Sequence, residues 1–170
     1  MIVIALGANL ATERYGPAQL GLEAALRRLD EFGVAVMQRS KWYRSAPYPP
    51  SDQPMYVNGV AQVESGLSPT ALMAILLSIE IDFGRRRSKP NASRVMDLDL
   101  IDFDGRILDR AADENDPALR LPHPRLTCRA FVLLPLLEIA PNWRHPEDGR
   151  HIDDLITALP GGQKIDLLES

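Results

Sequence analysis

The spacing of apolar residues changes along this chain in an order that few folds accommodate. In chain order, the spacing is that of a strand at 2–6, a helix at 17–29, strands at 34–42 and 56–63, a helix at 68–84 and a strand at 95–103. The two central strands flank a proline-rich loop at 45–54, and we expect them to pair antiparallel. The order βαββαβ predicts an α+β fold of the ferredoxin-like plait type, with an antiparallel sheet.

The rest of the chain adds C-terminal helices to this plait. The patterns indicate a short returning strand at 106–108, a polar loop at 113–117 and helices at 129–139 and 152–159. Pro135 is expected to kink or break the first of these helices. Because the chain has 170 residues and no Gly/Ser-rich linker, we expect one domain covering 1–170.

The charge and cysteine content exclude several classes of protein. A formal net charge of -4 opposes binding of the whole molecule to nucleic acid or to an anionic membrane, so any anion site must be local. The only cysteine, Cys128, can form no internal disulfide, and the apolar run at the N-terminus is too short for a signal peptide. No apolar stretch approaches the roughly 18 residues of a membrane span. We therefore expect a cytoplasmic monomer without nucleic-acid or membrane partners.

The most informative segment is the strand that contains Asp97 and Asp99. Residues two apart on a strand share a face, so both carboxylates point the same way while Met96, Leu98 and Leu100 point into the core. Their Cα atoms would lie roughly 6.6 Å apart, which lets the carboxylates converge on magnesium ions about 3.5–4 Å from each other. Alone, the pattern equally fits a half-exposed strand with a charged outer face.

A basic loop precedes this strand and favours the metal-site interpretation. Its cations are Arg85, Arg86, Arg87, Lys89 and Arg94, with no acidic residue among them. Arginine binds phosphate oxygens in two-point contacts, so a polyanion such as ATP is a natural partner. The alternative, a solvated loop or a nucleic-acid patch, does not explain why an Asp-x-Asp strand follows.

A third segment could recognise a flat heterocycle. Tyr56 and Asn58 share a strand face after the proline-rich loop, so a ring could stack on Tyr56 while the Asn58 amide reads its edge. Aromatic residues beside turns more often serve packing.

Gly7–Leu10 lacks the glycine patterns of a phosphate cradle, so an ATP site here is not a P-loop. His123 lies between two prolines, where its ring is either a ligand contact or a surface group.

Together these segments resemble the 6-hydroxymethyl-7,8-dihydropterin pyrophosphokinase (HPPK) family of folate biosynthesis. The matching motifs occur in family order from residue 1 to about residue 143: GANL, YRSAP with DQPMYVN, GRRR with SRVMDLDLI, LPHPRL and RAFVLLPLLEIAP. The chain departs from the family pattern at 91–93, where an aromatic-Gly-Pro segment is common. It also departs at Pro124 and in a longer polar loop around Glu114.

The resemblance implies a role for individual residues. Asp97 and Asp99 match the ligands of two magnesium ions, and Arg85 and Arg94 match catalytic arginines. The residues matching positions around the co-substrate ATP are Glu80, Arg85, Arg87, Arg94, Leu100, His123 and Arg129. The residues matching the pterin site are Ser45, Pro47, Tyr48, Tyr56, Asn58 and Phe131, with Tyr56 and Phe131 sandwiching the ring.

The expected reaction is direct in-line displacement. The pterin hydroxymethyl oxygen attacks the β-phosphorus of ATP and AMP leaves, while the loops at 45–54 and 84–94 close over the substrates. The sequence leaves three alternatives open: a plait of the RNA-recognition type, another metal-dependent phosphotransferase with the same strand, and a catalytically silent relative.

Overall fold

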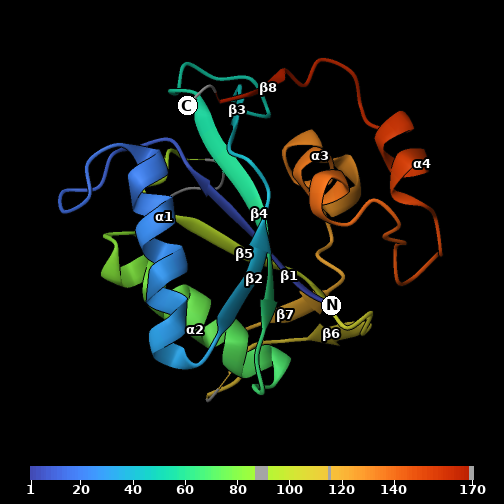
Figure 1. Cartoon of the computed structure of the whole chain (residues 1–170), viewed down its shortest axis with the longest axis horizontal. Helices are drawn as coiled ribbons and strands as arrows, with labels where there is room; N and C mark the ends of the chain where they lie inside the picture. The colour runs from blue at the N-terminus through green and yellow to red at the C-terminus, as the bar shows by residue number, and fades with distance from the viewer. Residues whose placement is uncertain (87–91, 115, 169–170) are drawn as a thin grey trace.

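Alternate residues of the first strand point to opposite faces of a sheet that is covered on both sides. The computed structural model describes residues 1–86, 92–114 and 116–168. The order of elements is β1 (Ile2–Ala8), α1 (Ala18–Leu29), β2 (Ala35–Arg39), β3 (Tyr43–Ser45), β4 (Tyr56–Glu64), α2 (Pro69–Asp82), β5 (Asp97–Phe103), β6 (Leu108–Arg110), β7 (Leu119–Leu121), α3 (Ala130–Ile139), α4 (Ile152–Thr157) and β8 (Ile165–Leu167). Figure 1 shows their arrangement.

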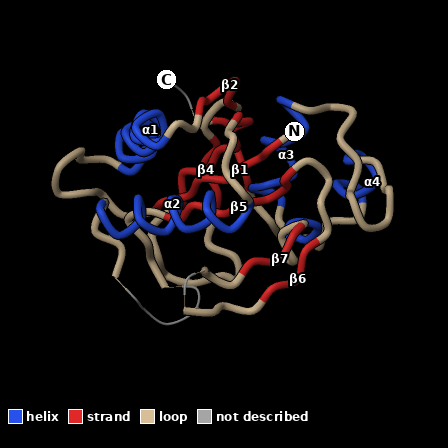
Figure 2. Tube along the Cα trace, turned by 90° about the horizontal axis from the view of Figure 1, so that it is seen from below, coloured by secondary structure: helices blue, strands red, loops and turns tan. Residues whose placement is uncertain are grey.

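The sheet follows the strand order β5-β1-β4-β3-β8, and β2 also pairs with β4. Every one of these pairs is antiparallel. Figure 2 shows α1 and α2 on one side of the sheet and α3 and α4 on the other. Ile2, Ile4 and Leu6 pack in the core under α1 and α2, whereas Val3 and Ala5 pack in the core under α3 and α4. The predicted ferredoxin-like arrangement is confirmed.

The strand predicted at 34–42 is wrong in its extent, because the chain bulges there. Arg39 pairs with Ala61 and Tyr43 pairs with Asn58, so three residues stand opposite two and separate β2 from β3. Trp42 lies in this bulge against Gly59. A Cβ atom on Gly59 would approach the Trp42 ring to 2.7 Å, so glycine is needed there.

Other sequence-based boundaries need smaller corrections. The returning strand predicted at 106–108 is β6, which pairs with β7 and leaves the polar loop as the connection between them. The helix at α2 begins as predicted, since Ser68 Oγ accepts a hydrogen bond from the Ala71 amide and Pro69 occupies the first turn. Pro135 does not end α3, which is continuous around this buried proline. Within the residues that the structure describes, no helix is long and apolar enough to cross a membrane.

Candidate active site

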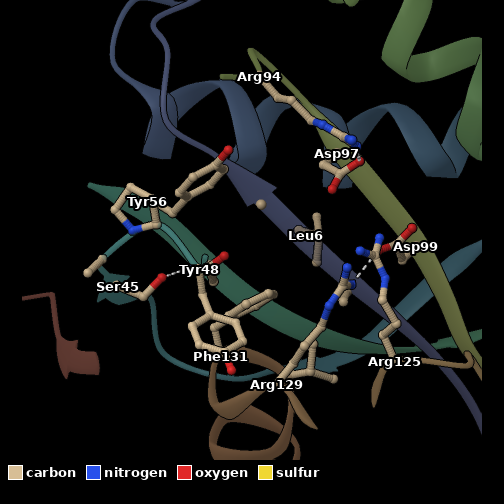
Figure 3. A pocket seen from close by; sticks show the side chains of 16 residues that line it. Leu6, Ser45, Tyr48, Tyr56, Arg94, Asp97, Asp99, Arg125, Arg129 and Phe131 are labelled. Carbon is tan, nitrogen blue, oxygen red and sulfur yellow. Dashed lines mark hydrogen bonds and ion pairs between the residues drawn. The ribbon is translucent and has the colours of Figure 1, made fainter. Parts of the chain in front are cut away.

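A pocket lies where β1, β4 and β5 meet the beginning of α3 (Figure 3). Its lining residues are Ala5, Leu6, Gly7, Ser45, Ala46, Pro47, Tyr48, Tyr56, Asn58, Arg94, Asp97, Asp99, Arg125, Arg129, Phe131 and Val132. The pocket therefore brings together both aspartates of β5, two of the expected arginines and every residue matched to the pterin site. Arg125 was not predicted, although it follows His123 by two residues in a motif that the sequence singled out.

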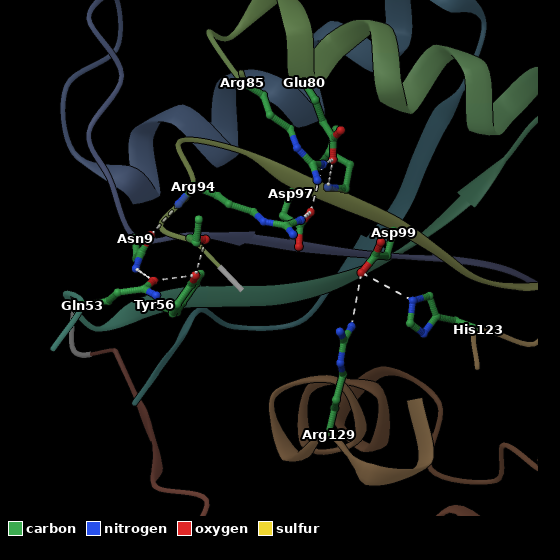
Figure 4. Close-up of polar contacts among 12 residues, drawn as sticks. Asn9, Gln53, Tyr56, Glu80, Arg85, Arg94, Asp97, Asp99, His123 and Arg129 are labelled. Carbon is green, nitrogen blue, oxygen red and sulfur yellow. Dashed lines mark hydrogen bonds and ion pairs between the residues drawn. The ribbon is translucent and has the colours of Figure 1, made fainter. Parts of the chain in front are cut away.

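One end of the pocket is formed by carboxylates and the cations that face them. Asp97 forms ion pairs with Arg94 and with Arg85, whose Nη1 lies 2.9 Å from Asp97 Oδ1 (Figure 4). Burial raises the pKa of Asp97, and the nearby Asp99 carboxylate adds to the rise, while both arginines oppose it. The structure thus gathers negative charge at one point and compensates it with arginine.

Asp99 has its own partners from the opposite side of the pocket. Its Oδ2 lies 3.4 Å from Arg129 Nη1 and 3.8 Å from His123 Nε2 (Figure 4). Burial lowers the pKa of His123, although Asp99 opposes this shift. The lowered pKa favours the neutral imidazole near pH 7. Arg129 stands at the start of α3, so the helix brings a cation to a carboxylate thirty positions earlier in the chain.

The donor set fits magnesium that is shared with a phosphorylated substrate. The two carboxylate side chains are 27% and 29% exposed and face the same pocket. Among the described residues, no group of three or more His, Cys, Asp or Glu side chains is arranged to hold a metal alone. Magnesium commonly takes one or two protein carboxylates and completes its shell with water and phosphate oxygens, so two aspartates beside phosphate-binding arginines are sufficient.

Glu80 lies beneath the site rather than in its wall. Its side chain is only 2% exposed, Oε1 accepts a hydrogen bond of 2.6 Å from the Leu98 amide, and its carboxylate pairs with Arg85. Burial raises the pKa of Glu80 to about 7, although the Leu98 amide and Arg85 both oppose the shift. Glu80 therefore joins α2 to β5 and orients Arg85 toward Asp97.

The other end of the pocket carries the aromatic rings and the amide. Tyr56 enters from β4 and Phe131 from α3, and Arg129 lies over the Phe131 ring at 5.4 Å from its centre (Figure 3). The buried Asn58 amide donates to Ser45 Oγ at 2.8 Å, which fixes the orientation of its carboxamide. Gly7 faces this amide, and a Cβ there would lie 3.2 Å from Asn58 Oδ1.

A hydrogen-bond network connects the three loops around the pocket, and its central residue was not predicted. Buried Asn9 donates to Gln53 Oε1 and Pro54 O, and its Oδ1 accepts from the Arg94 amide at 2.8 Å. The Tyr56 hydroxyl donates to Gln53 Oε1 at 3.2 Å. Asn9 thus ties the segment that carries Arg94 to the loop that precedes Tyr56. The GANL motif marked this position, but the sequence indicated only that it is not a P-loop.

A second pocket adjoins the first at Asp99. It is lined by Leu100 and His123 together with residues of the β6–β7 hairpin and its loop. The Leu100 side chain belongs mainly to the core, since it is 2% exposed. Arg87, which the resemblance assigns to ATP, lies outside the described residues.

Comparison with known proteins identifies the family. The family model described as 7,8-dihydro-6-hydroxymethylpterin-pyrophosphokinase (HPPK) matches residues 3–141. This chain belongs to the HPPK family. The resemblance drawn from the sequence motifs is therefore confirmed, and the chain is an enzyme of the pyrophosphokinase class.

Similar proteins match most of this chain. The 2-amino-4-hydroxy-6-hydroxymethyldihydropteridine pyrophosphokinase of Pseudomonas aeruginosa is 41% identical over 94% of this chain and 91% of its own length. The protein of the same name from Synechocystis is 41% identical over 91% of this chain and 73% of its own length. The crystal structure of Plasmodium falciparum HPPK-DHPS superposes with a TM-score of 0.70 at 15% identity. The superposition covers 92% of this chain and 43% of that longer chain. At this low identity, the likeness is evidence for the fold only.

Proposed function

We propose that this chain transfers pyrophosphate from ATP to the hydroxymethyl group of 6-hydroxymethyl-7,8-dihydropterin in folate biosynthesis, giving the pterin diphosphate and AMP. The observation that carries the proposal is the division of one pocket into two chemistries. Aromatic rings and a buried amide suit a flat, polar heterocycle, and the carboxylates with arginines suit a metal-bound polyphosphate. The names of similar proteins point to the same substrate.

The aromatic end would bind the pterin. Tyr56 and Phe131 offer ring faces from different elements, so a heterocycle can be stacked between them. Because the Asn58 amide nitrogen donates to Ser45, its carboxamide oxygen is the atom directed to accept from the ligand edge. Pro47 and the half-exposed Tyr48 would close the wall.

The charged end would bind the phosphates of ATP. Asp97 and Asp99 would hold the two magnesium ions, whose charge offsets that of the phosphates when they are bound. Arg94 and Arg129 line the pocket, and Arg85 approaches it through Asp97. We place the nucleoside in the adjoining pocket beside Leu100 and His123, since Asp99 borders both pockets.

The chemistry then depends mainly on alignment. The pterin hydroxymethyl oxygen forms a bond to the β-phosphorus, the bond from that phosphorus to the bridging oxygen of AMP breaks, and the hydroxyl proton passes to water. Tyr56, Phe131 and Asn58 hold the attacking oxygen in place, while the arginines stabilise the charge that spreads over the transferred group. We assign Glu80 the role of orienting Arg85, because its burial removes it from direct contact with ATP.

The deciding experiment measures AMP release from ATP and magnesium with and without 6-hydroxymethyl-7,8-dihydropterin, followed by mass analysis of the pterin. We expect AMP only when the pterin is present, and a product heavier by one pyrophosphate. AMP release at the same rate with and without the pterin would point to another metal-dependent phosphotransferase. No AMP in either case would point to a catalytically silent relative.

An RNA-binding plait is the weaker alternative. Such a plait reads bases on an open sheet face, whereas here Val3, Ala5 and Val60 on the second face pack under α3 and α4. Filter binding with RNA tests this directly.

We further propose that residues 1–170 act as a single catalytic domain and as a monomer, because one chain supplies every group of the pocket. Size-exclusion chromatography with light scattering tests the monomer.

A further inference from the structure

The segment that follows α4 runs back to the sheet and joins it beside β3. It ends in β8, which lies beside β3 in Figure 1 and pairs with it antiparallel. In this pairing Ile165 stands opposite Ser45. The Ala46 amide donates to Lys164 O at 3.1 Å, and the Leu168 amide donates to Trp42 O at 2.9 Å. This segment therefore supports the pocket wall that is formed by β3 and the loop after it.

Gln163, immediately before this contact, binds the opposite wall. Its Oε1 accepts from the Ala130 amide at 2.9 Å, and its Nε2 donates to Cys128 O at 3.0 Å. One carboxamide thus holds the peptide groups on both sides of Arg129. The same Nε2 also lies 3.3 Å from Pro160 O, which shapes the segment around Gln163 itself.

The first turn of α3 depends on this contact. Arg129 is the N-cap residue and makes no capping hydrogen bond with its side chain, so the Ala130 amide finds its acceptor in Gln163. Arg129 has an extended backbone, with φ -118 and ψ 105. From there its guanidinium reaches Asp99, and Phe131 follows two positions later. Fixing the peptide groups around Arg129 fixes the origin of both side chains.

We propose that Gln163 is a positioning residue of the active site. Together with the carbonyl of Lys164, it holds the α3 wall and the β3 wall of the pocket at a set separation. It touches neither substrate and acts through Arg129 and Phe131. The proposal rests on the function proposed above, since that function gives those two residues their roles toward ATP and the pterin.

The test compares Gln163→Ala with Gln163→Glu and with Lys164→Ala, a matched control. Glutamate keeps the acceptor for the Ala130 amide and loses the donor to Cys128 O. The Lys164 side chain is exposed, and its removal leaves in place the backbone carbonyl that accepts from the Ala46 amide. We expect Gln163→Ala to lower kcat/KM by about 10- to 100-fold and to raise the KM for the pterin, as losses of supporting contacts do. Glutamate should recover part of this loss, and Lys164→Ala should stay within about twofold of the unsubstituted protein.

A second measurement needs no substrate. Amide hydrogen exchange at Ala130, followed by NMR, should be at least about tenfold faster in Gln163→Ala than in Lys164→Ala, because its acceptor is removed. A loss of kcat with an unchanged pterin KM would indicate fewer folded molecules and would overturn the positioning role. Unchanged exchange at Ala130 would overturn the contact itself. If Gln163→Ala does not fold, Gln163→Leu, which keeps the bulk of the side chain but has neither the acceptor nor the donor, carries both readouts.

The two proposals fail in different ways. If the unsubstituted protein releases no AMP in response to the pterin, the proposed function fails, and with it the catalytic role of Gln163. Exchange at Ala130 would then still decide whether Gln163 fixes the start of α3.

Discussion

Asp97 carries a charge that burial opposes and that neighbouring arginines support. Burial and the Asp99 carboxylate raise its pKa, while Arg94 and Arg85 favour the ionised form. Such a group contributes little to folding, because the cost of removing it from water offsets its ion pairs. Its value lies in the negative charge that it presents to the pocket, so we expect Asp97 and Asp99 to matter far more for turnover than for stability.

Asp97→Asn and Asp99→Asn should each lower magnesium-dependent turnover by at least about 100-fold. The free energy of unfolding, from urea titration, should change by less than about 1 kcal/mol, because partly exposed ion pairs contribute little. Glu64→Gln, at an exposed position at the end of β4, is the control and should leave both quantities unchanged. Near-normal turnover in either aspartate variant would contradict the metal assignment.

Phe131→Ala tests the aromatic end of the pocket. Removing the ring should raise the KM for the pterin about tenfold, since a stacked aromatic contact contributes roughly 0.5–1.5 kcal/mol beyond its buried area. The KM for ATP, measured on the same sample, should stay within about threefold and serves as the internal control. An unchanged pterin KM would remove Phe131 from the binding site.

At the scale of elements, the contact between α2 and β5 decides how the basic side of the pocket is built. Glu80 leaves the last turns of α2, accepts from the Leu98 amide in β5 and pairs with Arg85 just after the helix. The pKa of its carboxyl is raised from 4.5 to about 7, with burial as the largest cause. The free energy that Glu80 contributes to the contact between α2 and β5 therefore depends on pH.

The sign of this linkage follows from the proton count. Between pH 4.5 and 7 the unfolded chain has released the Glu80 proton while the folded chain retains it, so this residue lowers stability as pH rises. Glu80→Gln cannot ionise and still offers an oxygen to the Leu98 amide. From pH 5 to pH 8 the variant should gain stability relative to the unsubstituted protein by on the order of 2 kcal/mol, measured by urea unfolding. A pH-independent difference would show that Glu80 titrates normally.

At the scale of the whole molecule, the loops around the pocket are connected by a small network of hydrogen bonds. Asn9 connects the segment around Arg94 to Gln53 and Pro54 in the loop before β4. A nucleotide and a pterin bound in the pocket would add contacts to the same loops. We therefore expect ligands to stabilise the whole fold and to reduce protease cleavage in the loop at 45–54.

Magnesium with ATP at about 100 times its Kd should raise the free energy of unfolding by about 2.7 kcal/mol. For a chain of this size, Tm should rise by roughly 5–10 °C, measured by calorimetry. EDTA, or the Asp99→Asn substitution, should remove most of the shift. The same shift without magnesium would show that ATP binds independently of the aspartates.

Much of the fold could be predicted from the sequence because its signals are local. A period of two shows that Asp97 and Asp99 share a face, and Ser68 with Pro69 shows where α2 begins. The βαββαβ order follows from such periods, and that order already places β5 beside β1. Local spacing determines which side of an element is buried, and it did so here for β1, β4 and β5.

Only the tertiary structure decided what those faces meet. The three residues of β8 carry no period to read, and the bulge before β3 depends on Trp42 packing against Gly59. Asn9 bonds to Arg94 across 85 positions, and Gln163 bonds to Ala130 across 33. Such contacts form because packing brings side-chain carboxamides and backbone groups that are far apart in the chain within hydrogen-bonding distance. A single sequence shows the groups but not their distances.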